Sequence, residues 1–137
     1  MVKIRPARKE DKIKIIELLK ETGLYYPAQN LNHFLVAEIN QKVVGALQLK
    51  KYKNYFFLSS LGVKKTYEKQ GIATSLLNYV QKNFRAPIYL YTIIPSFFAK
   101  FGFKPAQKLP PHLPSKNLLG CQDCQPQKCQ CLVWMPA

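Results

Sequence analysis

The stretch from Leu61 to Thr74 contains residue types that can bind a phosphate group. It leads from the end of an expected strand, through a loop, into an expected helix. The first turn of a helix exposes N–H groups that lack partners and carries a partial positive charge. Gly71 lets the backbone approach an anion closely, and the small Ala73 leaves room beside it. Three loop lysines add long-range attraction: Lys64, Lys65 and Lys69. An ordinary strand-to-helix connection also explains these residues, so this segment alone leaves both interpretations open.

All four cysteines lie within eleven residues near the end of the sequence: Cys121, Cys124, Cys129 and Cys131. Four thiolates at short spacing suit tetrahedral zinc, and the first pair has the two-residue gap common in zinc sites. Reduced or redox-active thiols are an equal alternative. A disulfide is the third, although a reducing compartment disfavours it. In each case we expect the cysteines to fix the C-terminal tail rather than to take part in catalysis.

The charge of the chain indicates an anionic partner. Lysine and arginine number 21 against 7 acidic residues, which gives a formal net charge of +14. Such a field suits a polyanionic cofactor, an acidic small substrate or nucleic acid. Only three of the basic residues are arginines, the residue that base recognition and bidentate phosphate binding favour. We therefore do not expect nucleic acid as the partner, and a lysine coat that only aids solubility is the simplest alternative.

Apolar periodicity predicts the elements that must hold these residues. Helices are expected over Asp11–Lys20, Gln70–Phe84 and, with proline in the first turn, Pro95–Phe101. Strands are expected over these ranges: Val2–Arg5, Phe34–Ile39, Lys42–Leu49, Tyr55–Val63, Ile88–Thr92, a region from Phe103, and Leu132–Met135. Asn40 and Gln41 are expected to form a hairpin turn, so that three consecutive strands make an antiparallel meander. Residues 25–32 are compatible with a short helix or a loop.

The fold class that follows is α+β (mixed α/β), in a single domain. Hydrophobic residues make up 47% of the chain and charged residues 20%, which excludes disorder as the main state. No apolar run approaches the roughly 18 residues of a membrane span, and the N-terminus has no apolar signal-peptide core. We therefore expect a soluble, cytoplasmic protein without a membrane partner.

The segment Glu68–Ala73 resembles the acyl-CoA-binding motif of the GCN5-related N-acetyltransferase (GNAT) superfamily. That motif reads [Arg/Gln]-x-x-Gly-x-[Gly/Ala] and follows a strand ending in Leu-x-Val, here Leu61-Gly62-Val63. The resemblance extends to Val43-Val44-Gly45 in the expected hairpin and to the aromatic segment Phe97–Phe103. The sequence is most similar to the amino-acid N-acetyltransferases of the acetylglutamate-synthase type, which also carry Phe-Phe and a preceding threonine, here Thr92.

This resemblance implies one central, mostly antiparallel sheet flanked by helices. Residues 1–104 would form the GNAT-like core, and residues 105–137 would form a proline-rich loop and cysteine-rich tail packed on the same domain. Acetyl-CoA would be the co-substrate. The residues that would bind it are Leu61, Gly62 and Val63, by pairing with the pantetheine and polarising the thioester carbonyl, and Glu68, Lys69, Gln70, Gly71, Ile72 and Ala73, by backbone amides that hold the pyrophosphate.

The implied activity is transfer of an acetyl group to the primary amine of a small molecule, with amino acids among the candidates. Acidic acceptors such as glutamate are compatible with the lysine-rich field. Protein N-termini or lysines are the next acceptor class. Two other functions stay open: a catalytically silent acyl-CoA-binding module, and a basic protein that associates with nucleic acid or the ribosome. A homodimer formed by edge-strand pairing is compatible with the fold, although nothing in the sequence requires it.

The sequence departs from the family pattern at three positions. Glu68 stands where the motif usually has Arg or Gln, so its carboxylate must turn away from a pyrophosphate. Phe98 stands where many members have a tyrosine that protonates the departing thiolate, and Phe57 stands where the acetylglutamate-synthase branch often has a glutamate. The catalytic residues are thus not identified. Side chains that could carry a proton are Tyr91, Ser59, Ser60, Tyr55 and His33, whereas His112 lies in the proline-rich loop.

Overall fold

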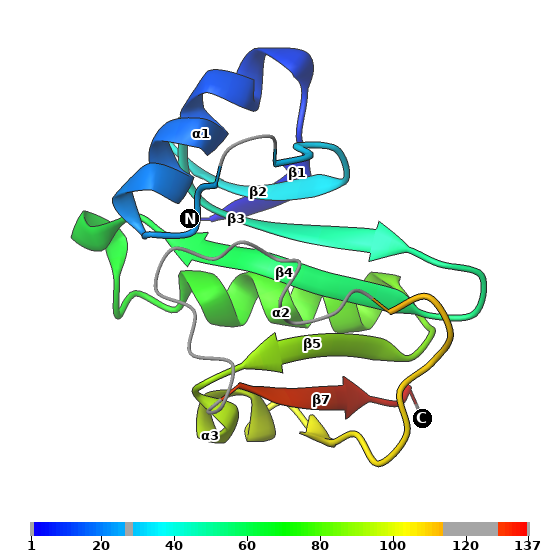
Figure 1. The fold of residues 1–137 in the computed structure, drawn as a ribbon. Coiled ribbons are helices and arrows are strands. Elements are labelled where there is room, and N and C mark those ends of the chain that lie inside the picture. The colour runs from blue at the N-terminus through cyan, green and yellow to red at the C-terminus, as the bar shows by residue number, and fades with distance from the viewer. Residues whose placement is uncertain (1, 27–28, 114–128, 137) are drawn as a thin grey trace.

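Seven strands form one sheet in the computed structural model, which describes residues 2–26, 29–113 and 129–136 (Figure 1). The strands are β1 Lys3–Pro6, β2 Phe34–Ile39, β3 Lys42–Lys51, β4 Phe56–Val63, β5 Ile88–Thr92, β6 Lys104–Pro105 and β7 Gln130–Trp134. Their order across the sheet is β1-β2-β3-β4-β5-β7-β6, and each neighbouring pair is antiparallel except β4 and β5. The predicted fold class, a mixed fold with one mostly antiparallel sheet and flanking helices, is confirmed.

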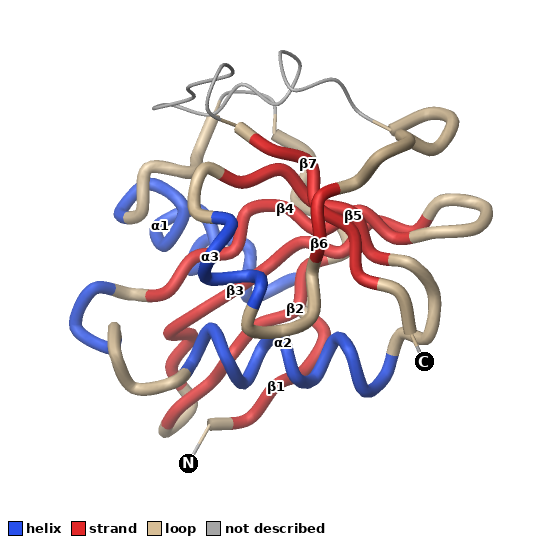
Figure 2. The backbone as a smooth tube through the Cα atoms, turned by 90° about the horizontal axis from the view of Figure 1, so that it is seen from below, coloured by secondary structure: helices blue, strands red, loops and turns tan. Residues whose placement is uncertain are grey.

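The two longer helices cover opposite faces of the sheet (Figure 2). Helix α1, Lys12–Glu21, packs Ile15, Leu18 and Leu19 against one face of β2 and β3. Helix α2, Ile72–Asn83, covers the other face with a stripe spaced four residues apart that includes Leu76 and Val80. Because side chains alternate along a strand, neighbouring residues of β2 enter these two separate apolar clusters.

The β2–β3 connection forms as predicted. Asn40 and Gln41 have φ values of 49° and 65°, so both central residues of the turn adopt the left-handed conformation that two-residue hairpins prefer. Residues 25–26 and 29–32, left open by the sequence, contain no helix or strand. The first helix and α2 were predicted within one or two residues of their observed ends.

A cluster of three charged side chains ties the start of α1 to the edge of the sheet. Arg5 on β1 contacts Asp11 Oδ2 at 2.7 Å and Glu38 Oε1 on β2 at 2.8 Å. Asp11 Oδ2 also accepts a hydrogen bond from the amide of Arg8 at 2.6 Å. The Arg5 and Asp11 side chains are only 11% and 9% exposed. This cluster fixes the direction of α1 and therefore the place where the chain leaves it, at Thr22.

The C-terminal strand β7 lies inside the sheet, between β5 and β6. Leu132 is buried there and Tyr91 lies opposite Cys131 in the register. The short helix α3, Pro95–Ala99, precedes β6 and buries Phe98. The division of the chain at residue 104 stays a prediction. None of the helices formed by the described residues has the length and apolar composition needed to span a lipid bilayer.

Candidate functional site

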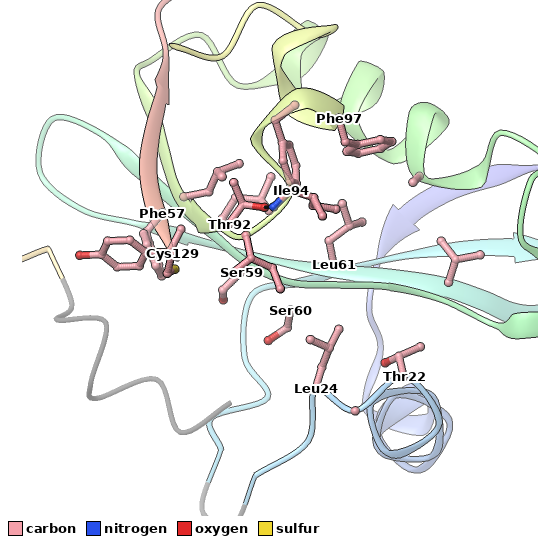
Figure 3. Close-up of a pocket in the computed structure, with 18 residues that line it drawn as sticks. Thr22, Leu24, Phe57, Ser59, Ser60, Leu61, Thr92, Ile94, Phe97 and Cys129 are labelled. Carbon is pink, nitrogen blue, oxygen red and sulfur yellow. Dashed lines mark hydrogen bonds between the residues drawn. The ribbon is translucent and has the colours of Figure 1, made fainter. Parts of the chain in front are cut away.

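A cavity of about 470 Å³ opens between the C-terminal halves of β4 and β5 (Figure 3). Its described walls come from five parts of the chain: the segment after α1, β4, the start of α2, the segment from β5 into α3, and the residue before β7. The lining residues are Thr22, Gly23, Leu24, Phe57, Leu58, Ser59, Ser60, Leu61, Val63, Ala73, Leu90, Tyr91, Thr92, Ile93, Ile94, Phe97, Phe98 and Cys129. Most of these side chains are apolar.

The cavity exists because β4 and β5 pair over only a short distance. Their parallel register covers Phe56 with Ile88 and Phe57 with Tyr89 and goes no further. The β3–β4 register shifts between Ala46 and Gln48, and Ser60 has a φ of 55° at this irregularity. A bulge bends the strand that carries it. The backbone of β4 beyond Leu58 therefore has no strand partner on its β5 side in the described chain.

The bulge also changes which side chains face each way. Leu61 points toward Phe97, whereas Ser60 points to the opposite side of β4, toward Leu24 (Figure 3). A Cβ placed on Gly62 would lie 3.0 Å from Thr22 Oγ1 and 3.2 Å from Leu24 Cδ1, so Gly62 packs against the segment that follows α1. The two sides of β4 thus give the cavity one wall near α3 and α2 and another near the end of α1.

The turn that precedes α2 has the backbone geometry expected of an anion site. Lys69 and Gly71 have φ values of 64° and 78°, and a Cβ on Gly71 would meet no atom within 4 Å. Ser75 is the first residue whose amide bonds within the helix turn, to Gly71 O at 2.9 Å. Within the described chain, the amides from Lys69 to Thr74 have no acceptor, which is the donor set that phosphate oxygens require.

The predicted cofactor-binding residues occupy two connected places. Leu61, Val63 and Ala73 line the cavity itself. The side chains at the other motif positions, Glu68, Lys69 and Gln70, are exposed on the turn. Ile72 differs, because its side chain is buried under Gly45, where a Cβ would lie 2.9 Å from Ile72 Cγ2. Only the backbone of Ile72 therefore faces the turn. The carboxylate of Glu68 has access to solvent, as a nearby pyrophosphate would require.

A network of neutral polar side chains includes Ser59 and Ser60 of the wall near α1. The Gln29 side-chain amide donates to Ser60 Oγ at 3.1 Å, and Ser59 Oγ donates to Gln48 Oε1 at 3.1 Å. The Gln48 amide in turn donates to the carbonyls of Asn30 and Asn32, each at 2.8 Å. The network connects the β4 bulge to the segment between α1 and β2.

Of the predicted proton-carrying side chains, Tyr91 lies in the cavity and faces the ring of Phe57 at 5.7 Å between centroids. Burial, and to a lesser degree the nearby Cys131, Cys129 and Tyr55, raises the pKa of Tyr91 to about 12. The phenol is thus protonated at neutral pH. It can donate a hydrogen bond to a negative charge but cannot act as a base.

Tyr55 and His33 lie away from this cavity. The Tyr55 hydroxyl donates to Pro111 O at 2.7 Å, and its ring stacks on Tyr52 at the other end of β4, beside a second cavity of about 400 Å³. His112 lines that second cavity, and His33 is exposed at the start of β2. Burial raises the pKa of Tyr55, which serves here as a structural hydrogen-bond donor.

Buried apolar side chains occupy the two positions at which members of the family often carry a catalytic acid or base. Phe98 is 6% exposed and packs against Phe97 and Phe103. Phe57 is also buried. Thr92 accepts a hydrogen bond from the amide of Ile94 at 2.9 Å, which shapes the turn between β5 and α3.

The cysteines do not form a metal centre in the part of the chain that can be described. Cys129 lines the cavity and Cys131 lies on β7, opposite Tyr91. Cys121 and Cys124 lie outside the described residues. Among the described residues, no group of three or more His, Cys, Asp or Glu side chains could hold a metal ion. The structure therefore gives no support to the predicted zinc site.

Sequence reasoning missed three parts of the cavity wall. These are the segment Thr22–Leu24, the pair Ile93–Ile94 and Cys129. Of these parts, only the two isoleucines could have been recognised from the local sequence. They follow a predicted strand but do not belong to the apolar stripe of a helix, so no packing role is predicted for them. They are 50% and 55% exposed, which is unusual for large apolar side chains.

Solved structures with the same fold include enzymes of several substrate classes. N-acetylglutamate synthase from Neisseria gonorrhoeae, complexed with coenzyme A and N-acetyl-glutamate, is 19% identical with a TM-score of 0.74, over 100% of this chain and 35% of that one. PaiA N-acetyltransferase from Thermoplasma acidophilum, complexed with coenzyme A, is 19% identical with a TM-score of 0.72, over 98% and 99% of the two chains. The ribosomal-protein-S18-alanine N-acetyltransferase of Escherichia coli is 14% identical with a TM-score of 0.72, over 100% and 95%.

The present chain thus spans about a third of the length of the N-acetylglutamate synthase, and these likenesses at low identity show the fold. No curated protein matches the sequence significantly. The sequence model of the acetyltransferase (GNAT) domain matches residues 30–105, which include both the cavity strand β4 and the turn before α2. Because that match covers more than half of the chain, the protein belongs to the GNAT acetyltransferase domain family, as the motif around Gly71 predicted.

Proposed function

We propose that the protein is an acetyl-CoA-dependent N-acetyltransferase that acts on the primary amine of a small molecule. One observation carries the proposal: the cavity that contains Ser59 and Tyr91 reaches Ala73, in the first turn of α2, where unpartnered amides are available. A single continuous space therefore joins a site for an anionic group to a site where a reaction can occur. The family match supports an N-acetyltransferase.

The residues of the α2 turn fit the diphosphate of coenzyme A. The amides from Lys69 to Ala73 supply hydrogen-bond donors, the helix start supplies partial positive charge, and Gly71 leaves the approach open. Exposed lysines surround the turn and add long-range attraction. Bound there, acetyl-CoA supplies an activated acyl group as a thioester.

The β4 backbone beyond Leu58 is suited to the extended arm of the same molecule. Its N–H and C=O groups on the β5 side lack a strand partner in the described chain, so they can pair with the amides of pantetheine as a strand would. An N–H group at this edge would also polarise the thioester carbonyl. Leu61 and Phe97 give that arm an apolar wall.

An uncharged amine then forms the new N–C bond at the carbonyl carbon, the C–S bond breaks, and the nitrogen loses a proton to solvent. Tyr91 is the candidate donor to the departing thiolate. The thiol of free cysteine has a pKa of about 8.5, and an alkyl thiol of this kind is more acidic than Tyr91, so the phenol stabilises the thiolate by a hydrogen bond rather than by full proton transfer.

Thermal unfolding with acetyl-CoA tests the binding half of this proposal. We expect saturating acetyl-CoA to raise the melting temperature by several degrees, because about 100 Kd of ligand adds about 2.7 kcal/mol. Ala73→Glu, which places a carboxylate in the cavity, should abolish the shift. Thr74→Glu is the matched control, since its exposed side chain stands one residue further along the same helix turn, outside the cavity. Equal shifts in both variants would contradict the proposed site.

Thiol release in the presence of amines tests the chemical half. Steady release supports an enzyme, whereas a melting shift without release from any amine supports a silent acyl-CoA-binding module. Salt-sensitive binding to RNA that coenzyme A does not reduce would favour the basic nucleic-acid-binding alternative.

A further inference from the structure

We propose that the acceptor is a small amine carried on an uncharged, largely apolar group, and not an acidic amino acid. The inference rests on the proposed function and specifies its substrate class. It differs from the sequence expectation, in which the lysine-rich charge of the chain was compatible with glutamate.

The first support is the composition of the cavity wall. None of its 18 described lining residues is Lys, Arg, His, Asp or Glu. None of the described basic residues of the chain therefore contributes a side chain to the cavity in which we place the acceptor. Their field acts at long range and is screened over about 8–10 Å at physiological salt, so it does not replace a contact partner.

The second support is the chemistry of the wall near α1. The polar side chains there are the hydroxyls of Thr22, Ser59 and Ser60. Thr22 Oγ1 donates to Leu18 O, and the two serines take part in hydrogen bonds with glutamine side chains. Leu24 lies beside Ser60 (Figure 3). Hydroxyls and amides can position a neutral amine or amide but do not neutralise a carboxylate.

The third support is the exposed apolar surface opposite that wall. Ile93 and Ile94 are 50% and 55% exposed, and both line the cavity. Contact with an apolar substituent would remove this surface from water, which is favourable at about 25 cal/mol per Å². A carboxylate in the same place would lose its hydration without gaining a cation.

An acceptor series with matched pairs tests the inference. We would measure kcat/KM by thiol release with leucinamide, leucine and glutamate at saturating acetyl-CoA, using the full chain. Leucinamide and leucine differ only in the amide or carboxylate. We expect leucinamide to exceed leucine at least tenfold and glutamate at least a hundredfold.

A charge-introducing pair sharpens this test. Ile93→Arg places a guanidinium on the cavity wall and should raise the ratio of glutamate to leucinamide turnover at least tenfold. Ile13→Arg makes the same substitution at a side chain that is 69% exposed on α1, outside the cavity, and should leave the ratio unchanged. Both positions are exposed, so both variants should fold.

The outcomes separate the two proposals. Glutamate turnover equal to or above that of leucinamide overturns this inference and leaves the acetyltransferase proposal intact. Cofactor binding without release from any of the three amines also counts against it. If acetyl-CoA neither stabilises the protein nor yields thiol with any amine, the proposed function fails and this inference fails with it.

Discussion

The cluster of Arg5, Asp11 and Glu38, here called the Arg5 cluster, contains charged side chains, whereas the described wall of the β4–β5 cavity contains none. In the cluster, Arg5, Asp11 and Glu38 are largely withdrawn from water, but each charge is within 2.8 Å of an opposite one. The cavity contains hydroxyls, aromatic rings and aliphatic side chains, and no charged side chain among its described residues. Among the described residues, the charges withdrawn from water in the cluster have partners of opposite sign, whereas the cavity wall offers a buried charge no such partner. The neutral cavity is therefore informative about its ligand.

Asp11→Asn should give the largest effect on stability. It leaves Arg5 with one partner instead of two and removes a charge-assisted hydrogen bond. We expect the free energy of unfolding at pH 7 to fall by about 2 kcal/mol, between the values typical of exposed and of buried ion pairs. Urea unfolding measures it. Glu17→Gln is the control, because the Lys14–Glu17 pair has a separation of 3.8 Å and is mostly exposed. A comparable loss of stability in Glu17→Gln would contradict a special contribution of the Arg5 cluster.

The same aspartate should make stability fall in acid. Hydrogen bonding from Arg5 lowers the pKa of Asp11 below its usual range, against the opposing effect of burial. The contribution of the Asp11 carboxylate to the free energy of unfolding is complete above the pKa that Asp11 has in the unfolded chain. It is lost as the pH falls through the lower pKa of Asp11 in the folded protein. The difference between the native chain and Asp11→Asn should therefore shrink below about pH 4. A difference that stays constant down to pH 2 would contradict this.

A carboxylate in the cavity should show the reverse dependence on pH. Ser59→Asp places a charge without a described cation beside Gln48 Oε1, which now accepts from Ser59. We expect a loss of about 1.5 kcal/mol at pH 7. The pKa of the new carboxyl should be raised, so the loss should diminish as the pH falls toward 4. Ser59→Asn is the neutral control, and an identical pH profile for both variants would show that the cavity tolerates charge.

Tyr91→Phe should give the smallest effect, and on catalysis rather than stability. Loss of one hydrogen bond to the thiolate should lower kcat about fivefold, with KM nearly unchanged. Tyr55→Phe removes the phenol that donates to Pro111 O and should instead lower stability, by about 1 kcal/mol, with kcat unchanged. Equal kcat for the native chain and Tyr91→Phe would remove Tyr91 from the proposed chemistry.

The elements themselves were predictable because their signals are local. The stripe from Ile72 to Val80 defines α2, and the Asn40-Gln41 turn defines the hairpin, each within a few neighbouring residues. The motif positions around Gly71 were assigned through the resemblance to the GNAT superfamily, since the segment alone left two interpretations open. The packing partner of Ile72 was not predictable, because the contact of its side chain with Gly45 joins residues that are distant in the sequence.

The sequence by itself determined the family, the helices and strands, and the turn before α2, since each depends on residues close together in the chain. Only the tertiary structure decided where the cavity lies and that its described wall is neutral. That wall joins Thr22, Ser60, Ile93 and Cys129, which are far apart in sequence. It opens because β5 leaves β4 after one short stretch of pairing and Ser60 bends the strand. Net charge is a property of composition, whereas the charge that a ligand meets depends on which side chains the fold brings around it.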